Sequence, residues 1–301
     1  MRITALSGGV GGARMLRGLA SIETVDMTAV VNVGDDDVIY GLHVAPDLDT
    51  VTYTMADVHS NARGWGRTDE TWHVMEELDR FPFDSTFRLG DRDLALNLYR
   101  TTRMARGATL ADVTSEICKV FGIEAAVLPV TDDPVRTKLF VGDTWLDFQD
   151  YFVRRRHADT VTDVRFAYVD DARPAPGVIR SLSSSDAVVI GPSNPILSIW
   201  PILAVPGVRE AMVGKRVMAV SPLIGGSAVK GPLADLLPSL GYSTDTEGIV
   251  RSYGDLLTDL VVHTGDEPSR PVTPAIHVTD TLIPDRDSAA RLAREMISWL
   301  E

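Results

Sequence analysis

The chain has 301 residues, of which 45% are hydrophobic and 24% are charged. These fractions are ordinary for a folded protein and exclude a chain that is disordered throughout. Asp and Glu outnumber Lys and Arg by 42 to 29, and the resulting net charge of −13 disfavours a surface that binds DNA or RNA. A small anionic ligand is still compatible with this charge, provided that its own charge is neutralised locally.

Cysteine chemistry and membrane insertion are both disfavoured by the sequence. Cys118 is the only cysteine, so neither an internal disulfide nor a cysteine-rich zinc site can form. Its apolar neighbours Ile117, Val120 and Phe121 predict a buried thiol rather than a nucleophile. No apolar stretch approaches the roughly 20 residues of a membrane-spanning helix, and the chain reaches Gly8 too early for a signal peptide. We therefore expect a cytoplasmic protein with no membrane partner.

A strand, a glycine turn, a helix and a second strand open the chain. Residues 3–6 predict a strand, and Ser7-Gly8-Gly9-Val10-Gly11-Gly12 follows it. Met15, Leu16 and Leu19 then share one face of a predicted helix. The second strand, over 27–33, is followed by glycine and three aspartates. This order is a βαβ unit, which predicts a parallel sheet whose strands end in loops at one edge.

The rest of the chain separates into a helical middle and a second half of short strands. Helices are expected over 69–81, 91–106 and 110–121, because apolar residues recur there every three or four positions, and Thr109 and Asp112 supply start signals for the last of them. Strands are expected over 125–130, 138–141, 164–169, 186–191, 216–220, 260–263 and 275–278, and a closing helix over 288–300.

We therefore predict the α/β class, with a Rossmann-like parallel sheet core and a largely helical insertion. The core takes residues 1–56 and 161–301, and the insertion takes 57–160. In such a fold, ligands bind in loops at the carboxyl ends of the strands.

The first glycine loop has the chemistry of an anion site. A dinucleotide fingerprint that starts at Gly9 needs a sixth-position glycine, but that position holds Arg14, and no Gly-Lys-Ser/Thr follows for a P-loop. Glycines still let backbone N–H groups approach an anion, and a helix start adds partial positive charge. A tight turn without a ligand is the alternative; the strand before and the helix after favour anion binding.

Six aspartates follow near this loop. They are Asp35, Asp36, Asp37, Asp47, Asp49 and Asp57. Any one of them could be solvated or could cap a helix, as Asp49 could do for the helix predicted after it. As a group beside a phosphate-binding loop they need a compensating charge, and a hard cation such as Mg²⁺ binds carboxylates and phosphate oxygens. The sequence therefore predicts Mg²⁺ without fixing its ligands.

Two later loops repeat this pattern after predicted strands. Ser193 and Asn194 offer hydrogen bonds to a base, ribose or phosphate, although Ser193 could instead cap a helix. The next loop contains Gly225 and Gly226 and leads to Lys230, which is either a counter-charge for phosphate or an exposed loop lysine. Together the three loops predict a site for a nucleotide diphosphate.

The predicted insertion carries two arginines in the run from Phe87 to Asp93. Arg88 and Arg92 could engage a phosphate or a planar ring, or could form surface ion pairs with Asp91 and Asp93.

Six motifs occur together in a specific order. They are Ser7-Gly8-Gly9-Val10-Gly11-Gly12, Asn32-Val33-Gly34-Asp35-Asp36, Pro46-Asp47-Leu48-Asp49-Thr50, Leu89-Gly90-Asp91-Arg92-Asp93, Gly191-Pro192-Ser193-Asn194-Pro195, and Ile224-Gly225-Gly226 through Lys230-Gly231-Pro232. With them the chain resembles, over nearly its whole length, the 2-phospho-L-lactate transferase family of coenzyme F-420 biosynthesis, and within it the actinobacterial phosphoenolpyruvate-transferring branch.

This resemblance implies a Mg²⁺-dependent transferase, often a homodimer. Its donor would be a guanosine diphosphate-linked three-carbon acid, enolpyruvyl-2-diphospho-5'-guanosine or the phospholactyl equivalent. Its acceptor would be the ribityl hydroxyl of the deazaflavin FO (7,8-didemethyl-8-hydroxy-5-deazariboflavin), and its products dehydro coenzyme F-420-0, or coenzyme F-420-0, and GMP. No residue identifies which acid is carried; the branch favours enolpyruvyl.

The resemblance also assigns roles to residues. Asp49 and Arg88 match the deazaflavin contacts. Asp49, the candidate catalytic group, could orient the hydroxyl, deprotonate it or, with Asp36, bind Mg²⁺, and the sequence does not separate these roles. Val33 stands where threonine is common in the family, which affects a single hydrogen bond. The nucleotide and diphosphate side is assigned to Gly9, Gly11, Gly12, Asn32, Asp36, Ser193, Asn194, Gly226 and Lys230.

Two other functions compete with this interpretation. A related group shares the glycine and Asn-x-Gly-Asp-Asp loops but binds nucleotide-sugars without catalysis; the motifs around Asp49 and Asp91 favour a second substrate and hence an enzyme. An NAD-dependent dehydrogenase is disfavoured by Arg14 in the fingerprint.

Overall fold

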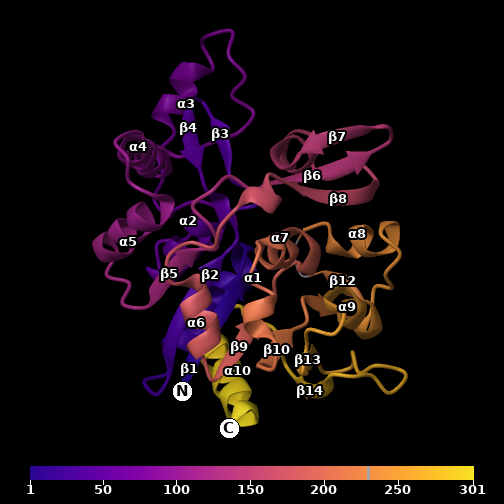
Figure 1. The fold of residues 1–301 in the computed structure, drawn as a ribbon. Helices are drawn as coiled ribbons and strands as arrows, with labels where there is room; N and C mark the ends of the chain where they lie inside the picture. The colour runs from indigo at the N-terminus through magenta and orange to yellow at the C-terminus, as the bar shows by residue number, and fades with distance from the viewer. Residues whose placement is uncertain (229–230) are drawn as a thin grey trace.

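A seven-stranded parallel sheet forms the centre of the computed structural model, which describes residues 1–228 and 231–301 (Figure 1). The strand order β14-β13-β10-β9-β1-β2-β5 confirms the predicted α/β class. The seven strands are β1 (Arg2–Ser7), β2 (Asp26–Val31), β5 (Ala126–Pro129), β9 (Ala187–Ile190), β10 (Arg216–Val220), β13 (Asp259–His263) and β14 (Ala275–Thr279).

The central strands are buried on both faces, as a parallel sheet covered by helices requires. Every residue of β9 and all but the first of β1 is buried. Helices α1 (Gly9–Ala20) and α10 (Arg286–Leu300) pack closely together, since a Cβ at Gly18 would lie 2.4 Å from the Ala289 carbonyl oxygen. The expected closing helix and the βαβ start are thus both present.

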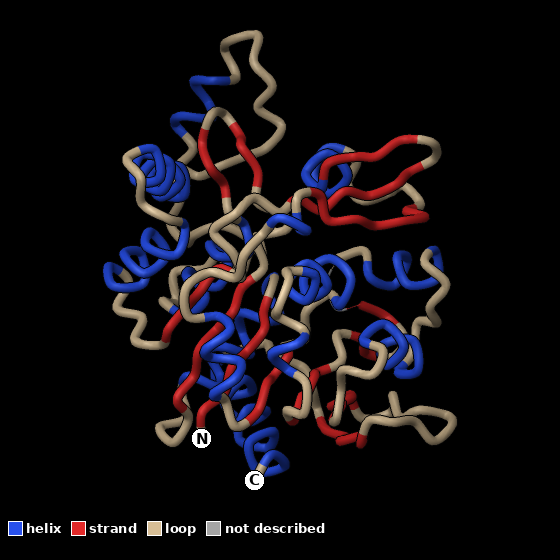
Figure 2. The backbone as a smooth tube through the Cα atoms, viewed as in Figure 1, coloured by secondary structure: helices blue, strands red, loops and turns tan. Residues whose placement is uncertain are grey.

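A hairpin and several helices surround the carboxyl end of the sheet, while both termini lie at the opposite end (Figure 1). The hairpin consists of β3 (Asp37–Ile39) and β4 (Leu42–Val44). The helices are α2 (Pro46–Met55), α3 (His73–Leu78), α4 (Asp91–Ala105) and α5 (Leu110–Val120). The predicted helix over 69–81 is therefore shorter than expected, and Figure 2 shows loop around α3. Thr109 and Asp112 cap α5 reciprocally, as predicted.

A separate antiparallel sheet, in the order β7-β6-β8, lies to the right of the hairpin in Figure 1. It is built from β6 (Arg136–Val141), β7 (Thr144–Asp147) and β8 (Val161–Ala167). The division into a core and an insertion at residues 57 and 161 stays a prediction. Two strands pair with a strand from the other predicted part. β5 comes from the range assigned to the insertion yet pairs with β2, and β8 comes from the range assigned to the core yet pairs with β6.

Shorter elements complete the described chain. They are η1 (Asp150–Arg154), η2 (Val169–Asp171), α6 (Val178–Ser184), η3 (Pro195–Ile199), α7 (Trp200–Ala204), η4 (Glu210–Met212), β11 (Leu223–Ile224), β12 (Ser227–Ala228), α8 (Leu233–Ser239) and α9 (Thr246–Tyr253). In the described parts of the chain, no helix has the length and apolar character needed to cross a membrane. Cys118 is buried in α5, as predicted, and burial raises the pKa of its thiol to about 11.

Candidate active site

The loops that follow the neighbouring strands β1 and β9 are in direct contact. The Ser193 hydroxyl donates to the Gly8 carbonyl (2.8 Å) and accepts from the Gly8 N–H (3.3 Å). A Cβ at Gly11 would lie 2.3 Å from the Pro192 carbonyl oxygen, and one at Gly12 would lie 2.4 Å from the Ser193 Oγ. The glycines are thus required by the close approach of the two loops. The nucleotide-binding roles of Gly11, Gly12 and Ser193 stay predictions.

The side chain of Asn194 caps the short helix η3. Its Oδ1 accepts hydrogen bonds from the N–H groups of Ile196 (2.9 Å) and Leu197 (3.1 Å). The capping role considered for Ser193 therefore belongs to Asn194, while Ser193 joins the two loops. A contact between Asn194 and the nucleotide, which we predicted, would have to use its remaining donors.

Asp47 is an anion already held at the start of α1. Its carboxylate accepts from the Gly9 N–H (2.6 Å) and from the Asn32 amide (2.9 Å). Burial raises the pKa of Asp47 to about 6, although the hydrogen bonds from Asn32 and Gly9 oppose the shift. The glycine loop therefore accommodates a carboxylate where we predicted that an anion would bind.

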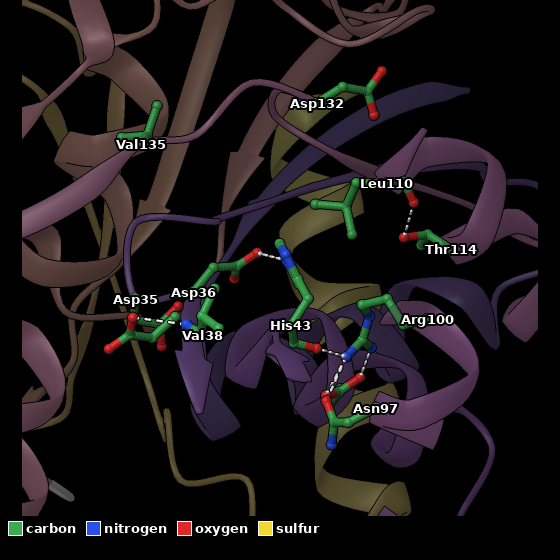
Figure 3. A network of polar contacts seen from close by, with 12 residues as sticks. Asp35, Asp36, Val38, His43, Asn97, Arg100, Leu110, Thr114, Asp132 and Val135 are labelled. Carbon is green, nitrogen blue, oxygen red and sulfur yellow. Dashed lines mark hydrogen bonds and ion pairs between the residues drawn. The ribbon is translucent and has the colours of Figure 1, made fainter. Parts of the chain in front are cut away.

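Asp35 and Asp36 each retain a buried oxygen without a partner. Asp36 Oδ2 lies 2.9 Å from His43 Nε2 (Figure 3), whereas no described residue hydrogen-bonds the Oδ1 atom of either aspartate. Burial, with the nearby charges of Asp47 and Asp36, raises the pKa of Asp35 well above its usual range. Buried acceptors are normally satisfied, so these two oxygens suit a cation.

Asp49 lies in the first turn of α2 and forms an ion pair with the guanidinium of Arg100. Both carboxylate oxygens accept from Arg100, whose Nη1 also donates to Asn97 Oδ1 (2.7 Å) and to the His43 carbonyl (3.3 Å; Figure 3). Burial raises the pKa of Asp49, and Arg100 opposes that rise. The N-cap of α2 is Ala45, so the alternative that Asp49 caps the helix is wrong.

The two predicted Mg²⁺ ligands differ in how well they fit a cation. Asp36 offers a buried free oxygen, whereas both oxygens of Asp49 are occupied by a cationic side chain. Within residues 1–228 and 231–301, no three or more His, Cys, Asp or Glu side chains group closely enough to hold a metal ion. Mg²⁺ commonly takes one or two carboxylates together with substrate phosphates and water, so the pair Asp35 and Asp36 is compatible with it.

Arg88 is half-exposed and bonded to Asp79. Its Nη1 donates to both oxygens of that carboxylate, at 2.8 and 2.9 Å. The alternative in which Arg88 pairs with Asp91 or Asp93 is therefore wrong. Asp91 instead accepts from the N–H groups of two residues in the first turn of α3.

A cavity of about 330 Å³ lies between residues 37–40, 83–87 and 149–154. The rings of Tyr40 and Phe83 line it with their centroids 5.1 Å apart, and the Tyr40 hydroxyl donates to the carbonyl of Phe87 (2.5 Å). An ion pair between Arg154 and Asp84 (2.7 Å) is part of its wall. The cavity is aromatic with a charged border, and no pattern in the sequence indicated it.

The third glycine loop is the turn between β11 and β12. Gly226 has a φ of +70°, which favours glycine, and the Gly225 N–H donates to the Asp266 carboxylate at 2.9 and 3.0 Å. The contact of Gly226 with the nucleotide stays a prediction. Lys230 lies outside the described residues.

Arg100, Asn97 and His43 are the site residues that the sequence did not reveal. A signal existed: Asp93, Asn97 and Arg100 recur at helical spacing within a predicted helix. An arginine is rarely buried without a partner, so this polar row could have indicated a facing carboxylate.

Comparison with known proteins finds matches over the full length of the chain. The family model of 2-phospho-L-lactate transferase CofD matches residues 3–297. The chain is 36% identical over 303 residues to the 2-phospho-L-lactate transferase of Methanocaldococcus jannaschii, covering 99% of this chain and 97% of the relative. It is 38% identical over 315 residues to the phosphoenolpyruvate transferase of Kitasatospora aureofaciens, covering 100% and 98%.

A solved structure with a similar fold comes from Bacillus halodurans. It is a member of the UPF0052 family and superposes with a TM-score of 0.66 over 98% of this chain and 99% of that chain. The sequence identity is 18%, so this likeness concerns the fold alone.

Proposed function

The chain belongs to the 2-phospho-L-lactate transferase CofD family, and on that premise we propose that it transfers a phosphoenolpyruvyl group from enolpyruvyl-2-diphospho-5'-guanosine to the ribityl hydroxyl of FO. The products would be dehydro coenzyme F-420-0 and GMP. The observation that supports a diphosphate donor is the pair of unpartnered buried oxygens on Asp35 and Asp36. They lie near the first glycine loop, because Asp47, which accepts from the Gly9 N–H, is close enough for its charge to raise the pKa of Asp35.

We propose Mg²⁺ as the cofactor, with Asp35 and Asp36 as its protein ligands in place of the predicted pair Asp36 and Asp49. A bound Mg²⁺ would neutralise diphosphate charge and stabilise the leaving phosphate. The chain's own contribution there is His43, which fixes one oxygen of Asp36 and leaves the other free.

The protein must also align the two substrates, because alcohol attack on a diphosphate depends on positioning and charge more than on covalent help. On the donor side, the first glycine loop would bind the diphosphate. The Gly9 N–H already donates to Asp47, so the diphosphate would either share this N–H with Asp47 or displace the Asp47 carboxylate from it. On the acceptor side, Arg88 and Asp49 would hold polar groups of FO. We place the planar ring in the aromatic cavity, whose volume of about 330 Å³ is at the lower end for small-molecule sites.

The test is incubation of the purified protein with FO, Mg²⁺ and the enolpyruvyl donor, followed by mass spectrometry. We expect a phosphorylated deazaflavin and an equal amount of GMP. Donor binding by calorimetry without any product would contradict the proposal and favour a nucleotide-binding protein without catalysis.

The identity of the acid needs a separate experiment, because the relatives carry both names. We propose enolpyruvyl. Competition between equal concentrations of the enolpyruvyl and phospholactyl donors should give mainly the dehydro product, and a dominant phospholactyl product would reverse the assignment. A homodimer and a cytoplasmic location are also proposals; light scattering of the purified protein tests the first.

A further inference from the structure

A row of polar side chains lies between α2 and α4. Asp49 and Tyr53 are one turn apart on α2, and Asp93, Asn97 and Arg100 occupy one face of α4. All five are at most 7% exposed. Burying charged groups between two helices is costly unless each has a partner, so the partners of each group are informative.

The row is connected by hydrogen bonds from one carboxylate to the other. Tyr53 donates its hydroxyl proton to Asp93 Oδ1 (2.7 Å), and the Asn97 amide reaches the same oxygen (3.3 Å). The other end of Asn97 accepts from Arg100 (2.7 Å), which holds both oxygens of Asp49. Asp49 and Asp93 therefore belong to one network.

The two carboxylates have different freedom to accept a proton. Protonation of Asp49 would disrupt an ion pair with a fixed, buried guanidinium. The hydrogen bonds from Tyr53 and Asn97 both reach Asp93 Oδ1 rather than Oδ2. Asp93 can thus take a proton on Oδ2 while Oδ1 stays anchored.

We propose that Asp93 is the catalytic base that accepts the proton of the attacking hydroxyl, while Asp49 stays charged and orients the acceptor. In this step the hydroxyl O–H bond breaks and its proton moves to Asp93 Oδ2. The hydroxyl oxygen forms a bond to the phosphorus, and the phosphorus–oxygen bond to GMP breaks with the electron pair leaving on GMP. The inference deepens the proposed function and rests on it.

The charges around Asp93 suit this role. Burial raises the pKa of Asp93 to about 7, and the negative charges of Asp49 and Glu70 act in the same direction. The hydrogen bond from Tyr53 and the charge of Arg100 oppose the rise. Arg67 lies over the Tyr53 ring, 5.6 Å from its centroid, and is a further cation on that side. A general base is most effective when its pKa is close to the working pH.

The main test is Asp93→Asn, which keeps the shape and the oxygen that Tyr53 and Asn97 contact but cannot accept the proton. We expect kcat to fall about 10²- to 10⁴-fold, the usual contribution of a general base, with little change in KM for FO. Asp91→Asn is the matched control in the same motif, because its more exposed carboxylate accepts hydrogen bonds from Thr71 and from the first turn of α3 and is outside the buried row.

Tyr53→Phe supplies an independent readout. It removes a hydrogen bond that favours the Asp93 carboxylate, so the pKa of Asp93 should rise and the acidic limb of the kcat profile should move to higher pH. A purely structural row of polar groups would lower the melting temperature without moving this limb.

Three outcomes are decisive. A folded Asp93→Asn variant with wild-type kcat, or an unmoved acidic limb in Tyr53→Phe, overturns the role of Asp93 alone. If the wild-type protein forms no product, the proposed function fails first and the inference fails with it. A large kcat loss confined to Asp93→Asn together with the shifted limb supports it.

Discussion

At the scale of single residues, the donors around each buried carboxylate decide what that carboxylate can do. Asp47 is held by an amide and a backbone N–H, Asp49 by Arg100, and Asp35 and Asp36 each keep a free oxygen. Burial alone raises the pKa of a carboxyl, and hydrogen bonds or cations oppose that rise. The sequence indicated that aspartates gather at the site. It did not indicate which one is paired, because Arg100 lies 51 positions from Asp49.

Arg100→Met tests the buried ion pair. Removing the guanidinium leaves Asp49 buried without its compensating charge, so the free energy of unfolding should fall by about 3–5 kcal/mol. Urea denaturation measures this.

Arg103→Met on the same helix is the control for that change. Arg103 pairs with Glu116 at the surface, where solvent screens the pair, so we expect only a small loss of stability. Equal, small losses for the two variants would contradict the importance that we give to the Asp49–Arg100 pair.

At the scale of elements, hydrophobic periodicity predicted the strands of the central sheet and the helices α1, α4, α5 and α10. Hydrophobic periodicity did not predict the β3–β4 hairpin, because its strands have only three residues each. Its turn is Tyr40-Gly41 rather than the common Asn-Gly, so the turn sequence did not indicate it either. Both turn residues have positive φ, +57° and +76°, a conformation that tyrosine seldom adopts. The aromatic cavity depends on this hairpin, so it could not be predicted either.

Phe83→Ala tests the cavity as the site of the deazaflavin ring. Aromatic pairs contribute about 0.5–1.5 kcal/mol beyond burial, so we expect the KM for FO to rise about 2- to 10-fold with little change in the KM for the donor. Steady-state kinetics with each substrate varied in turn measures both constants.

Phe81→Ala is the matched control, since Phe81 is 60% exposed and does not line the cavity. Equal effects of the two variants on the KM for FO would place the ring elsewhere.

At the scale of the whole molecule, the two edges of the central sheet have different roles. The loops at the carboxyl ends carry the site, whereas Asp259 and Arg216, at the start of β13 and β10, form an ion pair at the opposite edge. His277 Nε2 also donates to Asp259 Oδ1 (2.8 Å), and its ring stacks on Trp299 of α10 at a centroid distance of 4.6 Å. This cluster joins three strands to the closing helix and is remote from the chemistry.

Asp259→Asn should therefore lower stability without lowering kcat. Burial alone would raise the pKa of Asp259, but hydrogen bonds from Arg216, His277 and Thr258 together lower it to about 2. Because the folded-state pKa lies below that of the unfolded chain, the stabilisation is complete above about pH 4 and is lost as the pH falls toward 2. We expect the variant to lose about 2 kcal/mol at pH 7, as for hydrogen bonds to a charged group, and the difference from the wild-type protein to shrink below pH 4. Urea denaturation across this pH range, with kcat measured at pH 7, checks both parts; a large drop in kcat would mean that the two edges of the sheet are coupled.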